Sequence, residues 1–261
     1  MTLQARGITV RLGRTEVLHG IDFVAQPGEV TAIVGPNGSG KTTLMRALTG
    51  EVSYGGTVEI DGLDIARVKG WELAARRAVL PQATVLAFPF TVVEVVRMGL
   101  MTGVHGDDPT LPSRALAEVG LAGYESRFFQ ELSGGEQQRA HLARVLVQVW
   151  KPVAKDGPRW LLLDEPVSSL DIAHQLEVME LVARYAARGG GVVAVMHDLN
   201  LTALHAHRIA LMKDGRLRAF GPPGEVMTDG ILSEVYGCRL RVSAAPEGLP
   251  PFVLPHTAAL A

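Results

Sequence analysis

The fold of this chain is decided by a glycine-rich stretch, Gly35-Pro36-Asn37-Gly38-Ser39-Gly40-Lys41-Thr42. The stretch matches the pattern G-x-x-x-x-G-K-[ST] in full, follows the apolar run 30–34 and opens a helical pattern over 42–48. Glycines let successive backbone N–H groups turn inward around phosphate oxygens, and the dipole of the following helix adds positive potential. The pattern therefore predicts a phosphate-binding loop between a strand and a helix. The alternative is a glycine-rich turn that holds no ligand.

Two side chains of this loop have the chemistry that a nucleotide site needs. Lys41 can reach the terminal phosphates, and the hydroxyl of Thr42 can bind magnesium. We therefore expect residues 35–43, ending at Thr43, to bind the phosphates of a nucleotide together with Mg2+.

Adjacent carboxylates, Asp164 and Glu165, follow a second apolar run at 160–163. Carboxylates at the mouth of a buried strand are costly unless a cation or a proton-transfer task holds them. Asp164 can hold magnesium through water, while Glu165 can polarise an attacking water molecule. The alternative is a pair of solvated loop carboxylates.

A third apolar run, 192–196, ends at His197. Short continuous apolar runs separated by helical patterns are typical of a mostly parallel sheet covered on both faces, in which ligands gather at the carboxyl ends of the strands. We therefore expect His197 to join Lys41 and Glu165 at one sheet edge and to contact a terminal phosphate. The alternative is local hydrogen bonding at a helix start.

The segment Leu132-Ser133-Gly134-Gly135-Glu136 predicts the start of a further helix. Ser133 and Glu136 have the spacing of a capping box. The two glycines between them leave the backbone bare at a helix N-terminus, which is a ready anion site. This site cannot obviously face the first loop within the same chain, so a plain helix cap remains an alternative.

The rest of the chain predicts a single domain with two additions to the sheet. Alternating residues at 8–10, 17–23 and 57–60 indicate a small antiparallel sheet, with the turn Tyr54-Gly55-Gly56 before its last strand. The pattern becomes helical between about 90 and 150, and the polar stretches 105–109 and 151–159 predict exposed loops. We expect residues 1–86 and 147–261 to form the catalytic core and residues 87–146 to form a helical subdomain.

Composition argues against several classes of protein. The formal net charge of −2 lacks the basic excess expected of a protein that binds nucleic acid. No apolar stretch reaches the roughly 18 residues that a membrane span requires. The single cysteine, Cys238, and the absence of a signal-peptide pattern predict a reducing cytosol. Work at a membrane would therefore require docking onto other subunits.

Six segments together resemble the nucleotide-binding subunits of ABC transporters, and they occur in the family's order: GPNGSGKTT, LPQ, LSGGEQQR, WLLLDEP, SSLD and VMHD. The resemblance covers nearly the whole chain. It implies an α/β ATP-binding cassette of the P-loop NTPase class, with a RecA-like core, a small antiparallel β subdomain and a helical subdomain. It also implies an ATPase that uses ATP and Mg2+.

The resemblance assigns roles that the residues alone do not. It implies a head-to-tail homodimer in which residues 133–136 of one subunit close over the ATP held by the other, with Asp171 near the interface. Gln82 resembles the residue that senses magnesium and water beside the surface that contacts the membrane subunits. Arg11 stands where the family usually offers an aromatic ring to adenine, and its guanidinium plane can stack instead.

Within the family, the chain resembles the ATPase subunits of bacterial haem importers. The segments that carry this likeness are 87–92, the loop 151–159 and HDLNLTALHAHRIALMKDGRL at 197–217. It implies two integral membrane permease subunits, a periplasmic haem-binding protein and a peripheral position on the cytoplasmic face of the inner membrane. Residues 88–90 would then belong to the docking surface or to the helical core.

Three alternatives stay open at this point. The nearest is the ATPase of a ferric-siderophore or cobalamin importer, in the same branch of the family. A cassette protein acting on DNA, ribosomes or iron-sulfur assembly is a different class, although the chain shows no long coiled coil, duplicated cassette or basic patch. A monomeric phosphate-loop kinase or GTPase is the third, and the LSGGE segment speaks against it.

Overall fold

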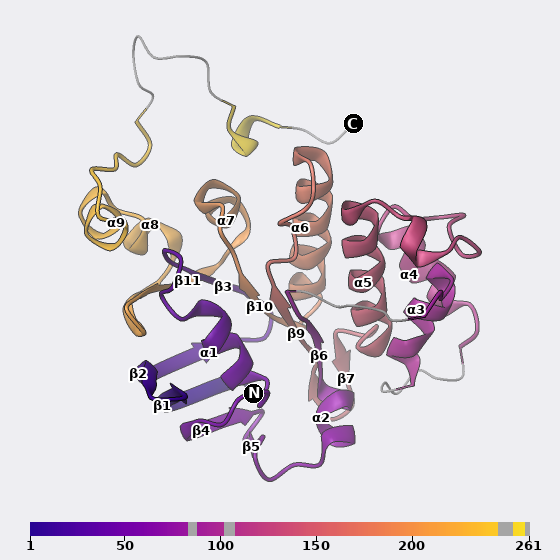
Figure 1. Ribbon diagram of the computed structural model, residues 1–261, viewed down its shortest axis with the longest axis horizontal. Coiled ribbons are helices and arrows are strands. Elements are labelled where there is room, and N and C mark those ends of the chain that lie inside the picture. Colours follow the sequence, from indigo (N-terminus) through magenta and orange to yellow (C-terminus); the bar gives the residue numbers. More distant parts are fainter. Residues whose placement is uncertain (83–87, 102–107, 245–252, 259–261) are drawn as a thin grey trace.

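The computed structural model describes residues 1–82, 88–101, 108–244 and 253–258, and a six-stranded sheet runs through its centre (Figure 1). The strand order is β12-β11-β3-β10-β9-β6, and neighbouring strands are parallel except for β12, which pairs antiparallel with β11. The predicted, mostly parallel sheet is confirmed. Its strands are β3 (Val30–Val34), β6 (Arg77–Leu80), β9 (Trp160–Asp164), β10 (Gly191–Val195), β11 (Arg208–Lys213) and β12 (Arg216–Gly221).

The boundaries of the three apolar strands differ slightly from the predicted ones. Strand β3 begins and ends as predicted, whereas β9 extends one residue further and β10 begins and ends one residue earlier. Asp164 is therefore the last residue of a buried strand, because its main chain still pairs with Val195 of β10.

Both faces of the central sheet are covered, which explains the continuous apolar runs. Ala32 and Val34 of β3 point into one core cluster and Ile33 points into the other. In β10, Ala194 and Val193 divide in the same way. Because successive strand residues point to opposite faces, a sheet with two buried faces favours apolar residues at nearly every position, and Thr31 of β3 is a buried polar exception.

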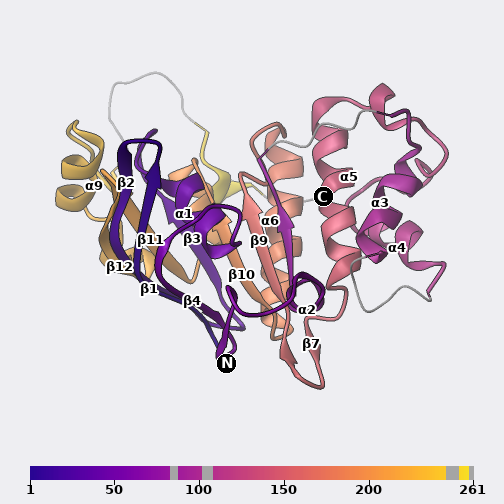
Figure 2. The same ribbon diagram turned by 60° about the horizontal axis from the view of Figure 1, so that its bottom comes forward.

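One face packs against helix α1 (Lys41–Leu48) and the four-stranded antiparallel sheet, and the other packs against helices (Figure 2). The antiparallel sheet has the order β2-β1-β4-β5 and consists of β1 (Leu3–Leu12), β2 (Thr15–Ala25), β4 (Gly55–Ile60) and β5 (Leu63–Asp64). The second face is covered mainly by α5 (Gly134–Gln148), α6 (Ile172–Ala187) and α7 (Leu199–His205).

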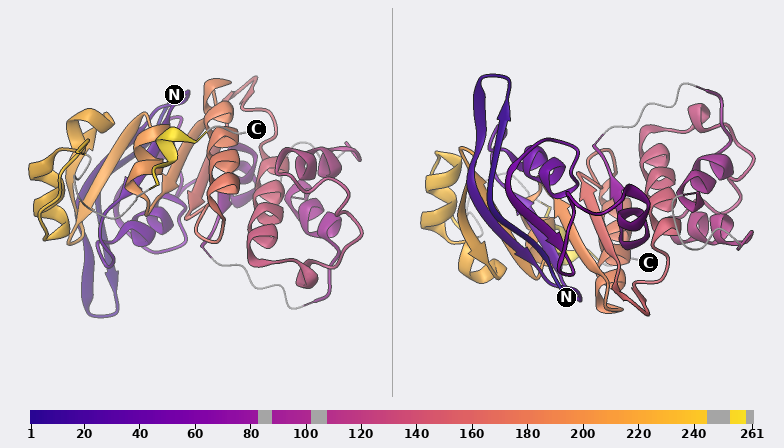
Figure 3. Two further views of the ribbon diagram at one scale, coloured as in Figure 1. Left: turned by 90° about the horizontal axis from the view of Figure 1, so that it is seen from above. Right: turned by 90° about the horizontal axis from the view of Figure 1, so that it is seen from below.

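The remaining helices lie toward the ends of the molecule. Helices α3 (Val92–Leu100) and α4 (Leu111–Glu118) pack on α5, and α5 also contacts β6. Figure 3 shows this group and the helices α8 (Pro223–Val226) and α9 (Asp229–Tyr236) at opposite ends. The other elements are α2 (Gly70–Arg76), β7 (Val153–Ala154), β8 (Gly157–Pro158) and the 3-10 turns η1 (Phe129–Glu131) and η2 (Pro255–Thr257). Among the described residues, no helix combines the length and apolar character that a bilayer span needs.

The loop 151–159 was expected to be exposed throughout, and this expectation is wrong for its second half. Strands β7 and β8 form a small antiparallel hairpin, and residues 157–159 are buried. Arg159 is 5% exposed, and its guanidinium donates to Asp156 Oδ1 at 2.7 Å and to the main-chain oxygen of Gly157 at 3.4 Å. An arginine in this position can be buried because its charge is paired. In the other predicted loop, residues 105–107 lie outside the described part of the chain.

The predicted turn at 54–56 is also corrected, because Gly55 and Gly56 already belong to strand β4. The backbone of Gly56 has φ 90°, and a Cβ atom there would lie 2.3 Å from the main-chain oxygen of Arg6. The glycine is needed for the close approach of β4 to the irregular part of β1 between Arg6 and Thr9.

Replacing Gly56 by alanine is expected to lower the free energy of unfolding by about 3 kcal/mol, through strained backbone and a clash with β1. The matched control is Gly62→Ala, since Gly62 has φ 83° but nothing within 4 Å of the added Cβ. The control should cost only about 1 kcal/mol, from backbone strain alone. Urea unfolding of both variants measures the difference, and equal losses would contradict the close approach.

Candidate nucleotide-binding and hydrolysis site

The glycine-rich loop runs from the carboxyl end of β3 to the first turn of α1. Gly40 precedes the helix with φ 97°, a left-handed conformation. A Cβ atom at this position would lie 2.8 Å from Leu18 Cδ2 of β2, so the loop packs tightly against the antiparallel sheet. The helix has no side-chain cap at its N-terminus, which leaves its first N–H groups open to an anion.

Lys41 lies folded over this loop. Its ammonium donates to the main-chain oxygens of Gly35 at 2.9 Å and Pro36 at 3.1 Å. Burial lowers the pKa of Lys41, while the charges of Glu165 and Asp164 act in the opposite direction. The ammonium group is therefore held by two neutral carbonyl oxygens. Phosphate oxygens can take their place and form stronger, charge-assisted hydrogen bonds with it.

Two adjoining cavities collect the predicted site residues. A cavity of about 250 Å3 contains loop residues together with Glu165 and His197, and it is lined by Val17, Asn37, Gly38, Gly40, Lys41, Thr42, Thr43, Glu165 and His197. A second cavity of about 310 Å3 is lined by Thr42, Met45, Arg46, Thr49, Glu51, Val79, Pro81, Gln82 and Asp164. Thr42 lines both cavities. Residues at or just after the ends of β3, β6, β9 and β10 thus meet at the carboxyl edge of the sheet, as the topology predicts.

Asp164 is a buried carboxylate whose surroundings favour a bound cation. The residue is 4% exposed, and burial, followed by the charge of Glu165, raises its pKa to about 6 against the opposing effect of His197 and Lys41. Among the described residues, its buried Oδ1 atom finds no hydrogen-bond donor. Because Thr42 and Gln82 supply further oxygens in the same cavity, the three side chains fit a hard cation such as Mg2+.

The raised pKa makes the nucleotide-free protein more stable when Asp164 is neutral. A carboxyl with pKa 3.8 when unfolded and about 6 when folded binds its proton more tightly in the folded state. Its destabilising effect therefore grows as the pH rises from 3.8 through 6 and reaches at most about 3 kcal/mol.

Asp164→Asn is therefore expected to stabilise the nucleotide-free protein by about 1–2 kcal/mol at pH 8 and by about half as much at pH 5. The gain is smaller than the full shift because the buried amide of asparagine brings polar atoms that also need hydrogen-bond partners. Urea unfolding in the presence of a metal chelator at both pH values measures it. A loss of stability at pH 8, or a gain independent of pH, would contradict the burial of an ionised Asp164.

Glu165 follows Asp164 with its backbone in the left-handed region, at φ 54°. A side-chain-bearing residue held in this way costs about 1–3 kcal/mol and occurs mostly at functional sites. Its Oε1 accepts a hydrogen bond from Gln82 Nε2 at 3.0 Å and lies 2.5 Å from His197 Nε2. The carboxylate is thus oriented from two sides at the wall of the phosphate-loop cavity.

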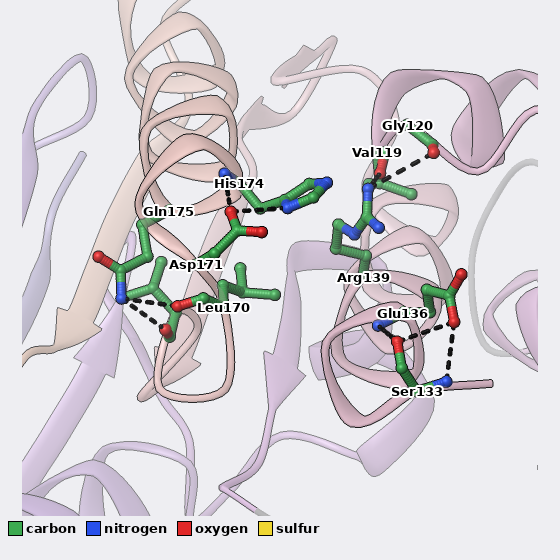
Figure 4. Close-up of polar contacts among 10 residues, drawn as sticks. Val119, Gly120, Ser133, Glu136, Arg139, Leu170, Asp171, His174 and Gln175 are labelled. Carbon is green, nitrogen blue, oxygen red and sulfur yellow. Dashed lines mark hydrogen bonds and ion pairs between the residues drawn. The ribbon is translucent and has the colours of Figure 1, made fainter. Parts of the chain in front are cut away.

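Figure 4 shows Ser133, Glu136 and Asp171, which we expect to contact the nucleotide of a second subunit. The capping box is confirmed, since Ser133 Oγ accepts from the backbone of Glu136 at 3.3 Å and the Glu136 carboxylate accepts from the Ser133 backbone at 2.8 Å. The Glu136 carboxylate also accepts a hydrogen bond from the Ser133 hydroxyl at 2.8 Å, and the bonds from the backbone and the hydroxyl of Ser133 lower the pKa of Glu136. Asp171 caps α6 by accepting from the backbone of His174 at 3.0 Å. None of residues 133–136 or Asp171 lines the phosphate-loop cavity of its own chain.

Arg11 also lies outside the cavity. It is at the tip of the β1–β2 hairpin, largely exposed, with its Nε 3.7 Å from Glu16 Oε2. The neighbouring Val17 does line the cavity. Arg11 therefore lies on β1, the strand that pairs with the cavity-lining strand β2.

Sequence reasoning missed Gln138, whose Nε2 donates to the main-chain oxygen of Glu165 at 3.3 Å. It also missed Gln175, whose Nε2 donates to the oxygens of Val167 at 3.4 Å and Leu170 at 3.0 Å. Both amides fix the loop that follows β9. The sequence offers one signal, the placement of Gln138 shortly after the predicted helix start at Ser133.

The profile of the ABC transporter family matches residues 18–168. Over 258 residues the chain is 63% identical to the hemin import ATP-binding protein HmuV of Roseobacter denitrificans, covering 99% of each chain. The chain belongs to the ABC transporter family. The corresponding protein of Rhizobium meliloti is 57% identical over 264 residues, covering 99% of this chain and all of that one.

Solved structures of ABC transporter proteins share the fold. An ATP-binding subunit of an ABC transporter superposes with a TM-score of 0.78 at 23% identity, covering 91% of this chain and 98% of that one. An ATP-bound bacterial Atm1-family ABC exporter gives 0.77 at 28% identity, with 90% of this chain and 41% of that chain covered. The predicted α/β ATP-binding cassette is thus confirmed, and the ABC protein described here binds and hydrolyses ATP.

Proposed function

We propose that the chain is the ATP-hydrolysing subunit of a bacterial ABC importer that moves haem into the cytoplasm. The observation that carries this proposal is the likeness to proteins named hemin import ATP-binding protein, at 63% identity over 258 residues in Roseobacter denitrificans and 63% over 256 residues in Jannaschia. Identity of this order over whole chains favours a shared cargo over a shared fold alone.

The residues that line the phosphate-loop cavity would have separate roles in ATP hydrolysis. Residues 35–43 would hold the phosphates with their main-chain N–H groups, and Lys41 would move from the oxygens of Gly35 and Pro36 to the terminal phosphates. The carboxylate of Glu165 would polarise the attacking water. His197 and Gln82, both bonded to that carboxylate, would keep it aimed at the phosphates. His197 would also contact the terminal phosphate, and Gln82 would lie beside the magnesium site.

Thr42, Gln82 and Asp164 would hold Mg2+ in the neighbouring cavity. When bound, the cation supplies positive charge to the phosphate oxygens and neutralises the buried Asp164. The unpaired Oδ1 of Asp164 supports this assignment.

Two copies of the chain would complete each other's sites. The cap at Ser133 and the exposed Gly134 present a helix N-terminus to an anion, yet residues 133–136 do not reach the cavity of their own chain. A head-to-tail homodimer would bring this terminus, with Asp171 beside it, onto the nucleotide of the partner. Arg11 would stack on the base.

The helical subdomain, which we assign to residues 87–146, would contact the membrane partners. Phe88 is 67% exposed, whereas Phe90 packs against the core, so of the two phenylalanines only Phe88 is free to dock. Ala87 lies outside the described residues. We propose two permease subunits and a periplasmic haem-binding protein as partners, and a peripheral place on the cytoplasmic face of the inner membrane.

The cargo is tested by reconstituting the chain with its permeases in proteoliposomes that contain the haem-binding protein. ATP turnover should rise several-fold with haem and should be coupled to haem passage. A complex with Glu165→Gln should bind haem and move none. Turnover coupled to cobalamin or a ferric siderophore, with haem inert, would contradict the proposed cargo while leaving the ATPase intact.

A further inference from the structure

Gln138 joins the helix that starts at the capping box to the hydrolytic end of β9. It lies in the second turn of α5, and its partly buried amide donates to the main-chain oxygen of Glu165 at 3.3 Å. The same helix begins at Gly134, beside the cap at Ser133. Helix α5 thus carries the predicted anion-binding N-terminus at Gly134 and, about one turn later, the side chain of Gln138 that bonds to Glu165.

The main chain of Glu165 is held at both of its polar groups. Its N–H donates to the oxygen of Val195 at 3.2 Å, and its carbonyl accepts from Gln138. Between these two bonds the residue has φ 54°, a conformation that persists only where the surroundings impose it. Loss of the Gln138 bond would let the peptide plane rotate and would redirect the carboxylate that Gln82 and His197 hold.

The loop after Glu165 is fixed separately. Gln175 of α6 donates to the carbonyls of Val167 and Leu170 (Figure 4). A Cβ atom on Gly135 would lie 3.2 Å from Leu170 Cδ2. The helix α5 and the loop therefore touch at two points. Of the two glutamines, only Gln138 bonds to the hydrolytic residue itself.

We propose that Gln138 is a positioning residue that couples the two ATP sites of the dimer. The inference rests on the proposed function, in which residues 133–136 contact the nucleotide of the partner. ATP bound by the partner contacts this helix terminus and fixes α5 in place, which keeps the hydrogen bond from Gln138 to the backbone of Glu165 in its own chain. Each site is thereby primed for hydrolysis by the nucleotide in the other.

The test uses Gln138→Met, which keeps the length of the side chain and removes the donor, and Gln138→Glu, which places an oxygen against the Glu165 carbonyl. ATPase rates of the full chain, assembled with its permeases, should show kcat reduced about tenfold in Gln138→Met and further in Gln138→Glu at pH 8, with KM within about twofold of the unchanged protein. The Hill coefficient for ATP should fall toward 1. Gln148→Met is the matched control and should keep kcat within about twofold, because Gln148 lies on the same helix but donates to the main-chain oxygens of Ala74 and Arg77.

A merely structural role predicts a different result. Both glutamine variants would then lose the same activity, or kcat and KM would change together with the melting temperature. Either result, or an unchanged Hill coefficient, would overturn the inference. If the unsubstituted protein neither hydrolyses ATP nor forms an ATP-dependent dimer, the proposed function itself fails, and the two failures are therefore distinguishable.

Discussion

Glu165→Gln is expected to bind ATP as tightly as the unsubstituted protein and to lose about 1000-fold in turnover. The amide keeps the shape of the side chain and can still bond to His197 and Gln82, but it cannot accept a proton from the attacking water. Because ATP then persists, the variant should accumulate as an ATP-dependent dimer. Steady-state ATPase assays and size-exclusion chromatography with and without Mg-ATP measure both effects.

Glu180→Gln is the control for this substitution. Glu180 lies on α6 with its side chain 48% exposed and pairs with Arg184 at 3.8 Å. It should change turnover by less than twofold. A Glu165→Gln protein that remains monomeric at saturating ATP would count against the site composed of two chains, and one that still turns over ATP would count against Glu165 as the residue that polarises water.

Lys41→Met is expected to lower kcat/KM for ATP by about 1000-fold. The ammonium of Lys41 is the cation that the loop itself carries, and losing two charge-assisted hydrogen bonds to phosphate corresponds to about 4 kcal/mol. Most of the loss should appear as weaker binding, which isothermal titration with Mg-ATP measures.

The folded protein should tolerate this change, because methionine removes a partly desolvated charge whose pKa burial lowers. Lys151→Met serves as the control, since Lys151 is exposed on the loop before β7. Unaltered ATP affinity in Lys41→Met would show that the phosphates bind elsewhere.

The central sheet and its ligand-bearing edge could be predicted from the sequence because burial on two faces leaves an unmistakable pattern. The run Val30–Val34 became β3 without change, and the polar residues after each run meet in two adjoining cavities. The capping box could be predicted for a similar reason, since Ser133 and Glu136 satisfy each other over three residues. A sequence pattern is sufficient to predict structure where the interacting residues are close in sequence, or where burial makes a whole segment apolar.

Long-range main-chain contacts could not be predicted in this way. Gly56 looked like a turn residue because the sequence does not show that β1 approaches it, and 157–159 looked exposed because the pairing of Arg159 depends on the hairpin. Gln138 contacts a carbonyl 27 positions away. No pattern in the sequence around Gln138 indicates this partner, so the contact is found only in the folded structure.

In the proposed site, one nucleotide and one magnesium ion are shared by the loop after β3 and the carboxylates at the end of β9. A crystal structure of the Glu165→Gln protein with Mg-ATP would show whether they are shared. We expect Lys41 Nζ on the terminal phosphates instead of the oxygens of Gly35 and Pro36, the cation beside Thr42, Gln82 and Asp164, and Ser133 of a second copy over the nucleotide. ATP bound away from this edge, or Lys41 still bonded to its own loop, would contradict the account.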